Sequence, residues 1–219
     1  HELRNPLTSV RSALETLRRI ENPENRNRLL AIIADDAVRM DRLIADISDS
    51  SRVDAELSRT ISAPVDIAPI LSALAELHEA TRAEADAPSV MLEAAPGPLV
   101  VRGVEGRIVQ VFRNLLGNAL SFSPRGGKVL VKARPAGSVV EVAIEDEGPG
   151  IPEQKLESIF ERFYSERPSG ERFGQHSGLG LSISKQIVEG LRGQISAENR
   201  RDAEGKVVGA RFVVRLPTA

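Results

Sequence analysis

The sequence predicts an α+β protein in which an N-terminal helical hairpin precedes an α/β sandwich with a mixed, largely antiparallel sheet. Near the N-terminus, apolar residues recur at helical spacing, and further along the chain helical patterns alternate with short runs of β-branched residues. The chain has 219 residues, of which 41% are hydrophobic, 27% charged and 3% aromatic. This is the composition of a globular protein that can bury a core.

The first helix of the hairpin is predicted from apolar residues that alternate at spacings of four and three, namely Leu3, Leu7, Val10, Leu14 and Leu17. After a polar break at residues 21–25, a second series of the same kind runs from Leu30 to Ile47. Two helices joined by a short loop lie antiparallel, and one hairpin is too small to bury both seams. We therefore expect a second copy to complete a dimeric four-helix bundle, with this domain at residues 1–58.

Residues 51–64 are expected to form a connector, because they are polar and small and because Pro64 and Pro69 bracket a short extended stretch. The sandwich domain is placed at residues 59–219. Its expected helices are 68–84, 107–122 and 179–191. Its expected strands are 90–92, 99–102, 128–133, 139–145, 194–198 and 207–216. Helices covering one face of such a sheet form an α+β sandwich.

Charge and cysteine content exclude several classes of function. Lys and Arg total 29 against 31 Asp and Glu, and a net charge of −2 offers no electrostatic basis for binding nucleic acid. The absence of cysteine excludes disulfides, thiolate nucleophiles and Cys-based zinc sites, and it fits a cytoplasmic protein. No apolar run approaches the roughly 18 to 20 residues that cross a bilayer, so we expect no membrane contact by this segment.

The first motif with chemical potential is His1-Glu2-Leu3-Arg4-Asn5-Pro6. The neutral ring nitrogen of an exposed imidazole is a nucleophile, and a nearby carboxylate fixes its tautomer and takes the released proton. Asn5 lies one helical turn from His1, where its amide could hold a water in line with an acyl phosphate on a partner. Taken alone, the motif is more simply a terminal histidine on a polar helix with no role in catalysis. Because His1 already belongs to a helical pattern, we expect the chain to be a fragment of a longer protein.

Asn114 and Asn118 lie one turn apart on the expected helix 107–122, so both amides project from the same side. Amide oxygens are hard ligands that can complete the coordination of a Mg²⁺ ion already holding triphosphate oxygens. Many helices also tolerate such a pair without using it.

Two glycine-containing segments have the composition of nucleotide-binding turns. Asp146 directly follows the strand 139–145, where its carboxylate can accept a hydrogen bond from an exocyclic amine such as that of adenine, and Gly148 and Gly150 permit close backbone approach. In Gly178-Leu179-Gly180-Leu181, glycines lead into a helix N-terminus whose unpaired N–H groups favour phosphate. A tight turn and an ordinary helix start are the plainer alternatives for each segment alone.

In order along the chain, five segments resemble the H, N, G1, F and G2 boxes of bacterial two-component sensor histidine kinases. They are residues 1–7, 114–119, 146–152, 159–164 and 176–181. The resemblance covers essentially the whole chain and includes the GHKL-type ATP-binding fold shared with gyrase and Hsp90-type ATPases. It implies that His1 is the phosphoacceptor, that Glu2 is its base, and that Asn5 assists dephosphorylation of the cognate response regulator.

The resemblance also implies roles around ATP. Asn118 is a Mg²⁺ ligand and Asn114 lies beside the phosphates. Phe122 is an aromatic contact for the base, Asp146 recognises adenine, and Arg162 is a lid residue that approaches the phosphates. The backbone positions implied at the nucleotide are Gly148, Gly150, Gly178, Leu179, Gly180 and Leu181.

The implied function is ATP-dependent phosphorylation of His1 in a homodimer, followed by transfer to an aspartate of the response regulator, with phosphatase activity toward that regulator. The implied parent protein is anchored in the inner membrane with this part in the cytoplasm. Two alternatives stay open: a catalytically weak nucleotide-binding scaffold, because Ser121 stands where relatives often carry Lys, and a phosphatase-dominated switch, which would depend on Asn5. Whether phosphorylation is in cis or in trans is also open. His78 is expected on a helix surface and Arg200-Arg201 as solvated charge.

Overall fold

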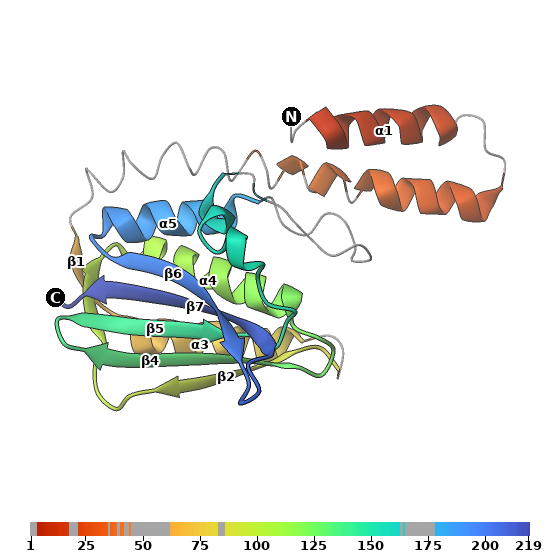
Figure 1. Ribbon diagram of the computed structural model, residues 1–219. Helices are drawn as coiled ribbons and strands as arrows, with labels where there is room; N and C mark the ends of the chain where they lie inside the picture. Colours follow the sequence, from red (N-terminus) through yellow and green to blue (C-terminus); the bar gives the residue numbers. More distant parts are fainter. Residues whose placement is uncertain are drawn as a thin grey trace.

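The structure is a computed structural model, and it consists of a helical hairpin followed by a helix-covered sheet (Figure 1). It describes residues 4–17, 22–34, 36–38, 40–41, 44, 62–82, 86–162, 164 and 178–219. The prediction of an α+β protein with a mixed sheet is confirmed.

The hairpin pairs helix α1 (Arg4–Leu17) with helical residues 23–34, and Figure 1 shows the two helices running antiparallel. Asn22 caps the second helix, because its Oδ1 accepts hydrogen bonds from the N–H groups of Glu24 (2.9 Å) and Asn25 (3.3 Å). Pro23 follows in the first helical position, where its missing N–H costs nothing. The polar break predicted at residues 21–25 therefore contains a helix start.

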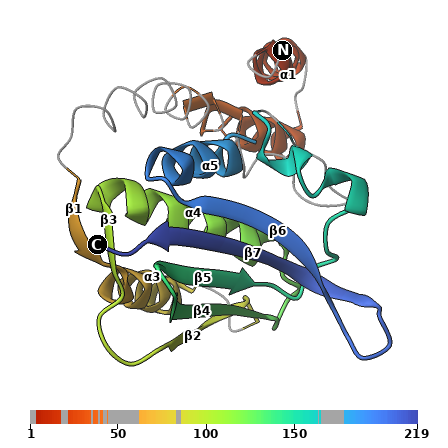
Figure 2. The same cartoon turned by 60° about the vertical axis from the view of Figure 1, so that its left-hand side comes forward.

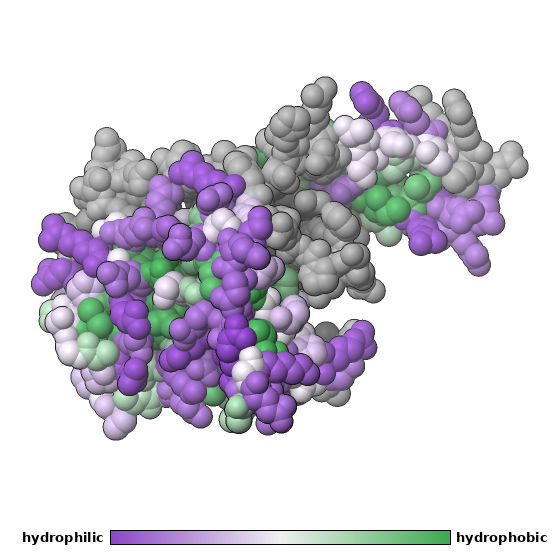
Figure 3. Space-filling view, viewed as in Figure 1, coloured by the Kyte–Doolittle hydropathy of each residue, from purple (hydrophilic) through white to green (hydrophobic). Residues whose placement is uncertain are grey.

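Several large apolar side chains of the hairpin are exposed in the single chain. Ala13 is buried, but large apolar side chains on both helices remain between 41% and 53% exposed: Leu7, Leu14, Leu30, Ile32, Val38 and Ile44. Figure 3 shows apolar side chains gathered on this part of the molecule. Contiguous exposed apolar surface of this kind marks a surface that packs against another molecule.

The second part of the chain is built on a five-stranded sheet in the order β2-β4-β5-β7-β6. Its strands are β2 (Ser89–Ala94), β4 (Lys128–Ala136), β5 (Val139–Glu145), β6 (Gln194–Arg201) and β7 (Val207–Pro217). Strands β2 and β4 are parallel and the other pairs are antiparallel. All five strands were predicted, with ends that differ by a few residues.

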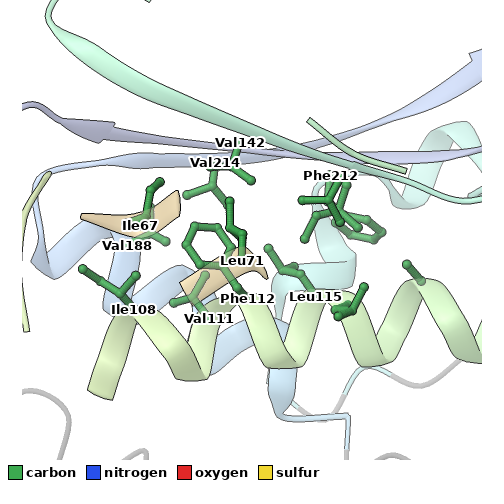
Figure 4. Packing of buried hydrophobic residues seen from close by; sticks show 14 of the residues in the cluster. Ile67, Leu71, Ile108, Val111, Phe112, Leu115, Val142, Val188, Phe212 and Val214 are labelled. Atoms are coloured by element: carbon green, nitrogen blue, oxygen red, sulfur yellow. The ribbon is translucent and has the colours of Figure 1, made fainter. Parts of the chain in front are cut away.

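Three helices cover one face of this sheet: α3 (Ile67–Thr81), α4 (Glu105–Phe122) and α5 (Gly180–Gly190) (Figures 1 and 2). Their apolar stripes meet the inward-facing residues of the central strands, and Figure 4 shows Phe112 and Leu115 of α4 directed toward Val142 and Val214. Each such side chain contributes about 1.5–3 kcal/mol by leaving water. The other face of the sheet carries hydrophilic side chains (Figure 3).

A short strand, β1 (Ala63–Asp66), pairs antiparallel with β3 (Val100–Gly103) and leads directly into α3. The expectation that Pro69 closes an extended stretch is wrong. Asp66 instead caps α3, since its Oδ1 accepts the N–H groups of Ala68 (3.1 Å) and Leu99 (3.0 Å). Pro69 then lies in the first helical turn, where the N–H has no intrahelical acceptor and its loss is tolerated.

Three further sequence expectations bear on this part of the chain. His78 is half-buried rather than on an open surface, because its Nε2 donates to the carbonyl of Pro88 (2.9 Å) and ties α3 to the start of β2. Between β5 and α5 the chain forms two 3₁₀ turns, η1 (Glu153–Lys155) and η2 (Ser158–Phe160), which were not predicted. The domain boundary at residues 58 and 59 lies outside the described residues and stays a prediction.

Within the part of the chain that the structure describes, none of the helices combines the length and the apolar character needed to span a bilayer.

Candidate functional site

Asp146 is a buried polar residue directly after the end of strand β5. Only 2% of its surface is exposed, although it directly follows the last β5 residue paired with β7. Its Oδ1 accepts hydrogen bonds from the N–H groups of Gly148 (2.9 Å) and Ala210 (2.9 Å). Its Oδ2 has no hydrogen bond to any described residue. One carboxylate oxygen is thus used to hold the turn, and the other remains available to a donor from a ligand.

Burial raises the pKa of Asp146 above its ordinary value, because removal from water disfavours the charged carboxylate. The two backbone N–H donors and the positive charge of Arg200 act in the opposite direction but do not cancel the burial. A buried carboxylate with one unused oxygen gains most from a ligand that donates a hydrogen bond to it.

The turn after Asp146 depends on its two glycines. A Cβ on Gly148 would lie 2.7 Å from the carbonyl oxygen of Phe122, the last residue of α4. Gly150 has a φ of +79°, and a Cβ there would overlap the side chain of Val207. The turn is also tied to β6, because Asn199 donates from Nδ2 to the Ile151 carbonyl (2.6 Å) and accepts from the Ile151 N–H at Oδ1 (2.7 Å).

Helix α4 joins this turn to the start of α5. Asn114 donates from Nδ2 to the carbonyl of Gly180 (3.2 Å), and Phe122 meets Gly148 at the other end of the same helix. Asn118 lies one turn from Asn114 and is partly exposed, and its side chain has no hydrogen bond to a described residue. The structure therefore brings both asparagines, Phe122 and both glycine segments around one helix.

The start of α5 has the features of an anion site. Gly178 has a φ of +71°, Leu179 is buried, and no side chain caps the helix. The N–H groups of a first helical turn have no intrahelical acceptor and lie at the positive end of the helix dipole. Leu181 packs against the core, which leaves the backbone of the Gly178–Leu181 segment as its polar surface.

Some predicted site residues are not placed beside this cluster. His1 and Glu2 lie outside the described residues, and Asn5 lies in α1 with its side chain outside the description. Arg162 is exposed just after η2, and no described contact joins it to Asp146 or to α5. Their roles stay predictions.

Sequence reasoning missed two residues that hold Asp146 and the turn after it. Arg200, expected to be solvated, donates from Nη1 to the Asp146 backbone carbonyl (2.6 Å), so that expectation is wrong. Its neighbour Arg201 does lie at the surface, where it pairs with Glu153. Asn199 was not considered, although an amide beside a strand end is a weak signal of backbone bonding. Neither contact could be inferred locally, because β6 and β5 are distant in sequence.

Gly209 is a further glycine that the site requires. Its φ is +150°, and a Cβ there would overlap the backbone carbonyl of Asp146. We expect Gly209→Ala to lower the free energy of unfolding by about 2–4 kcal/mol, from backbone strain and overpacking together, as measured by urea denaturation. Gly205→Ala is the matched control, because Gly205 also has a positive φ (+83°) but has open space around a Cβ. Equal destabilisation of the two variants would contradict this reading of Gly209.

Two family models match the chain. The model described as histidine kinase-, DNA gyrase B-, and HSP90-like ATPase matches residues 103–219, and the His Kinase A (phospho-acceptor) domain matches residues 1–56. Among characterised proteins, the sensor protein ChvG of Rhizobium meliloti is 45% identical over 223 residues. That match covers 99% of this chain and 39% of ChvG, so the chain spans well under half of that relative.

Solved structures of similar fold include the mycobacterial sensor histidine kinase MprB, with 30% identity and a TM-score of 0.58 over 72% of this chain and 97% of that one. Full-length ShkA in complex with AMPPNP has 27% identity and a TM-score of 0.68 over 100% of this chain and 45% of that one. ShkA was thus solved with an ATP analogue bound.

Proposed function

Because this chain belongs to the family of two-component sensor histidine kinases, we propose that it is a kinase core that uses ATP to phosphorylate His1 and then passes the phosphoryl group to an aspartate of a response regulator. The observation that carries the proposal is the buried carboxylate of Asp146, which has one oxygen committed to the turn and one unused. The family model that matches this part of the chain is that of an ATPase, so ATP is the ligand that this carboxylate would recognise.

We propose that Asp146 binds the adenine base of ATP and that the start of α5 binds its phosphates. The Oδ2 of Asp146 would accept a hydrogen bond from the exocyclic amine of adenine, and Phe122 would contact the ring. The uncapped N–H groups at the start of α5 would bind phosphate oxygens, with Asn114 holding the Gly180 backbone in place. The two assignments use different elements, so base recognition and phosphate binding are separable by mutation.

Asn118 fits a Mg²⁺ ion that arrives with the nucleotide. Its amide oxygen is a hard ligand, it has no partner among the described residues, and it projects from α4 one turn beyond the residue that contacts Gly180. Mg²⁺ commonly takes only one or two protein ligands and completes its shell with phosphates and water. When bound, the ion would neutralise charge on the triphosphate.

The residues proposed to carry out phosphoryl transfer lie outside the part of the chain that the structure describes. A ring nitrogen of His1 would form the N–P bond as the bond between the γ-phosphorus and its bridging oxygen breaks and ADP leaves, and Glu2 would take the ring proton. Asn5 would position a water for hydrolysis of the phosphorylated regulator. Because there is little covalent work for the protein in this reaction, most of the acceleration would come from positioning.

The exposed seam of the hairpin supports a homodimer. Leu7 and Leu14 on α1 and Leu30 on the second helix are about half exposed in one chain, and a second hairpin would bury them in a four-helix bundle. We propose the domains as residues 1–58 for this bundle and 59–219 for ATP binding. We also propose that the longer protein is membrane-anchored, with this part in the cytoplasm where ATP and the regulator are available.

The pH dependence of nucleotide binding tests this assignment. The ionised carboxylate of Asp146 is the acceptor, so ATP affinity should fall as the pH drops through the raised pKa of this group, at a higher pH than for an exposed Asp. Stability of the free protein should change in the opposite direction. A raised folded-state pKa contributes stability at low pH that is lost as the pH rises through that pKa.

Titration calorimetry from about pH 8 down to about pH 4, the ordinary pKa of an Asp, would measure the affinity, and thermal unfolding would measure the stability. ITP is the control, because it carries the same titrating triphosphate but lacks the exocyclic amine. The ratio of ATP to ITP affinity should fall toward low pH. A ratio that does not change with pH would rule out Asp146 as the group that reads the base.

A further inference from the structure

We infer that Arg200 is a positioning residue for adenine recognition. Its guanidinium bridges the backbone carbonyl of Asp146 and the carboxylate of Glu145, and it thereby fixes the strand end from which the Asp146 carboxylate projects. This inference rests on the proposed ATP binding and adds a residue to it. Arg200 does not itself contact the base in this scheme.

A β-bulge directs Arg200 to this point. The register between β6 and β7 pairs Arg200 with Gly209 but Arg201 with Val207, so one residue of β7 is unpaired there. Bulges bend a strand and re-aim its side chains. The partner across the strand has no side chain, and the Asp146 carbonyl passes so close to Gly209 that a Cβ would overlap it. The guanidinium of Arg200 reaches this carbonyl past Gly209.

The carbonyl of Asp146 depends on this contact. The ladder between β5 and β7 ends at the pair Glu145 and Arg211, and beyond it the N–H of Ala210 is used by the Asp146 side chain. Arg200 is the sole donor to the Asp146 carbonyl among the described residues. A buried carbonyl that loses its partner costs about 1–3 kcal/mol, so the strand end would shift to find another donor.

Glu145 holds the other side of the guanidinium. Its side chain is 9% exposed and lies 3.6 Å from Arg200 Nε, 3.3 Å from Lys132 Nζ and 3.3 Å from Arg211 Nε. These cations come from β6, β4 and β7, so the carboxylate is anchored from three strands. A planar guanidinium held at two points has a fixed orientation, whereas a lysine ammonium is a point charge on a flexible stem and does not fix one.

Loss of Arg200 should therefore affect the base more than the phosphates. The carboxylate of Asp146 lies on the strand end that Arg200 holds, whereas the proposed phosphate site lies at the start of α5 and is supported by Asn114 of α4. Small displacements of a recognition group weaken its hydrogen bond steeply. A role in global stability alone would instead weaken both parts of the nucleotide equally.

Calorimetry with AMPPNP and with ITP on the full chain tests the inference. We expect Arg200→Gln to weaken AMPPNP binding about tenfold while ITP binding changes by less than about twofold. Arg201→Gln is the matched control, because Arg201 is the next residue on β6 and pairs with Glu153 at the surface; it should leave both affinities unchanged. Arg200→Lys keeps the charge but not the planar, rigid geometry of the guanidinium, so its affinity for AMPPNP should be intermediate.

Three results would overturn the inference: an equal loss for both nucleotides in Arg200→Gln, an equal effect of Arg201→Gln, or wild-type selectivity in Arg200→Lys. Thermal unfolding of each variant identifies a loss that comes from unfolding, and Arg200→Lys then decides the question if Arg200→Gln does not fold. Failure of the proposed function is distinguishable, since in that case the wild-type chain would bind neither nucleotide.

Discussion

The His1→Gln variant should bind ATP as the wild type does but acquire no acid-labile phosphate when it is incubated with radiolabelled ATP. Glutamine has similar polarity but no nucleophilic ring nitrogen, and the N–P bond of phosphohistidine is the acid-labile species. The expected loss of labelling is complete, to the background of the assay. Nucleotide affinity should not change, because every residue assigned to ATP lies in the sandwich domain.

Labelling the wild type and His1→Gln in parallel distinguishes a histidine kinase from a scaffold that only binds nucleotide. A scaffold that binds nucleotide without transferring phosphate would leave wild type and variant equally unlabelled. Label retained by His1→Gln would mean that another side chain accepts the phosphoryl group. Either result would remove His1 from the mechanism while leaving the ATP site to be judged separately.

The Asp146→Asn variant should lose about a hundredfold in ATP affinity without losing stability. The Asn Oδ1 can still accept the N–H groups of Gly148 and Ala210, so the turn is kept. Its Nδ2 then occupies the position of the carboxylate Oδ2. This places an N–H donor of the protein opposite the exocyclic amine of adenine, which is also a donor, so the hydrogen bond is lost. Because burial raises the pKa of Asp146, removing the charge should maintain or increase the free energy of unfolding.

Titration calorimetry and thermal unfolding of the free protein measure the two effects. Glu147→Gln is the matched control, because Glu147 is the next carboxylate along the chain and is exposed, and among the described residues its side chain accepts only the Lys128 N–H (3.0 Å). It should bind ATP normally. Wild-type affinity in Asp146→Asn would eliminate the assigned role of this carboxylate, and a loss of affinity accompanied by unfolding would make its role structural.

The parts of the candidate site that could be predicted are those made by neighbouring residues. Asp146 directly follows β5, a strand rich in β-branched residues, and Asn114 and Asn118 share a helix face because of the helical period. The G1 and G2 glycines were likewise predicted from short motifs, and Gly150 and Gly178 do adopt positive φ values. In each case the signal lies within one turn or one strand end.

The expectations that were wrong depend on contacts between residues that are not neighbours in the sequence. Pro69 was expected to close an extended stretch, yet the Asp66 cap starts α3 at Ile67 and places Pro69 in its first turn, where a proline is tolerated. Arg200 was taken as solvated because nothing beside it in the sequence is its partner. Its contacts, Glu145 and the Asp146 carbonyl, come from a strand on the far side of β7.

By itself the sequence determined the two architectural halves, the elements within them and the residues with which ATP chemistry is proposed. These follow from periodicity, caps and turn residues, whose physical causes act over a few positions. The tertiary structure alone decided how Asp146 and the turn after it are held, through Arg200 and Gly209 at Asp146 and Asn199 at Ile151. Those contacts depend on the strand order β5-β7-β6 and on a bulge in its last pair, and long-range pairing leaves no periodic trace in the chain.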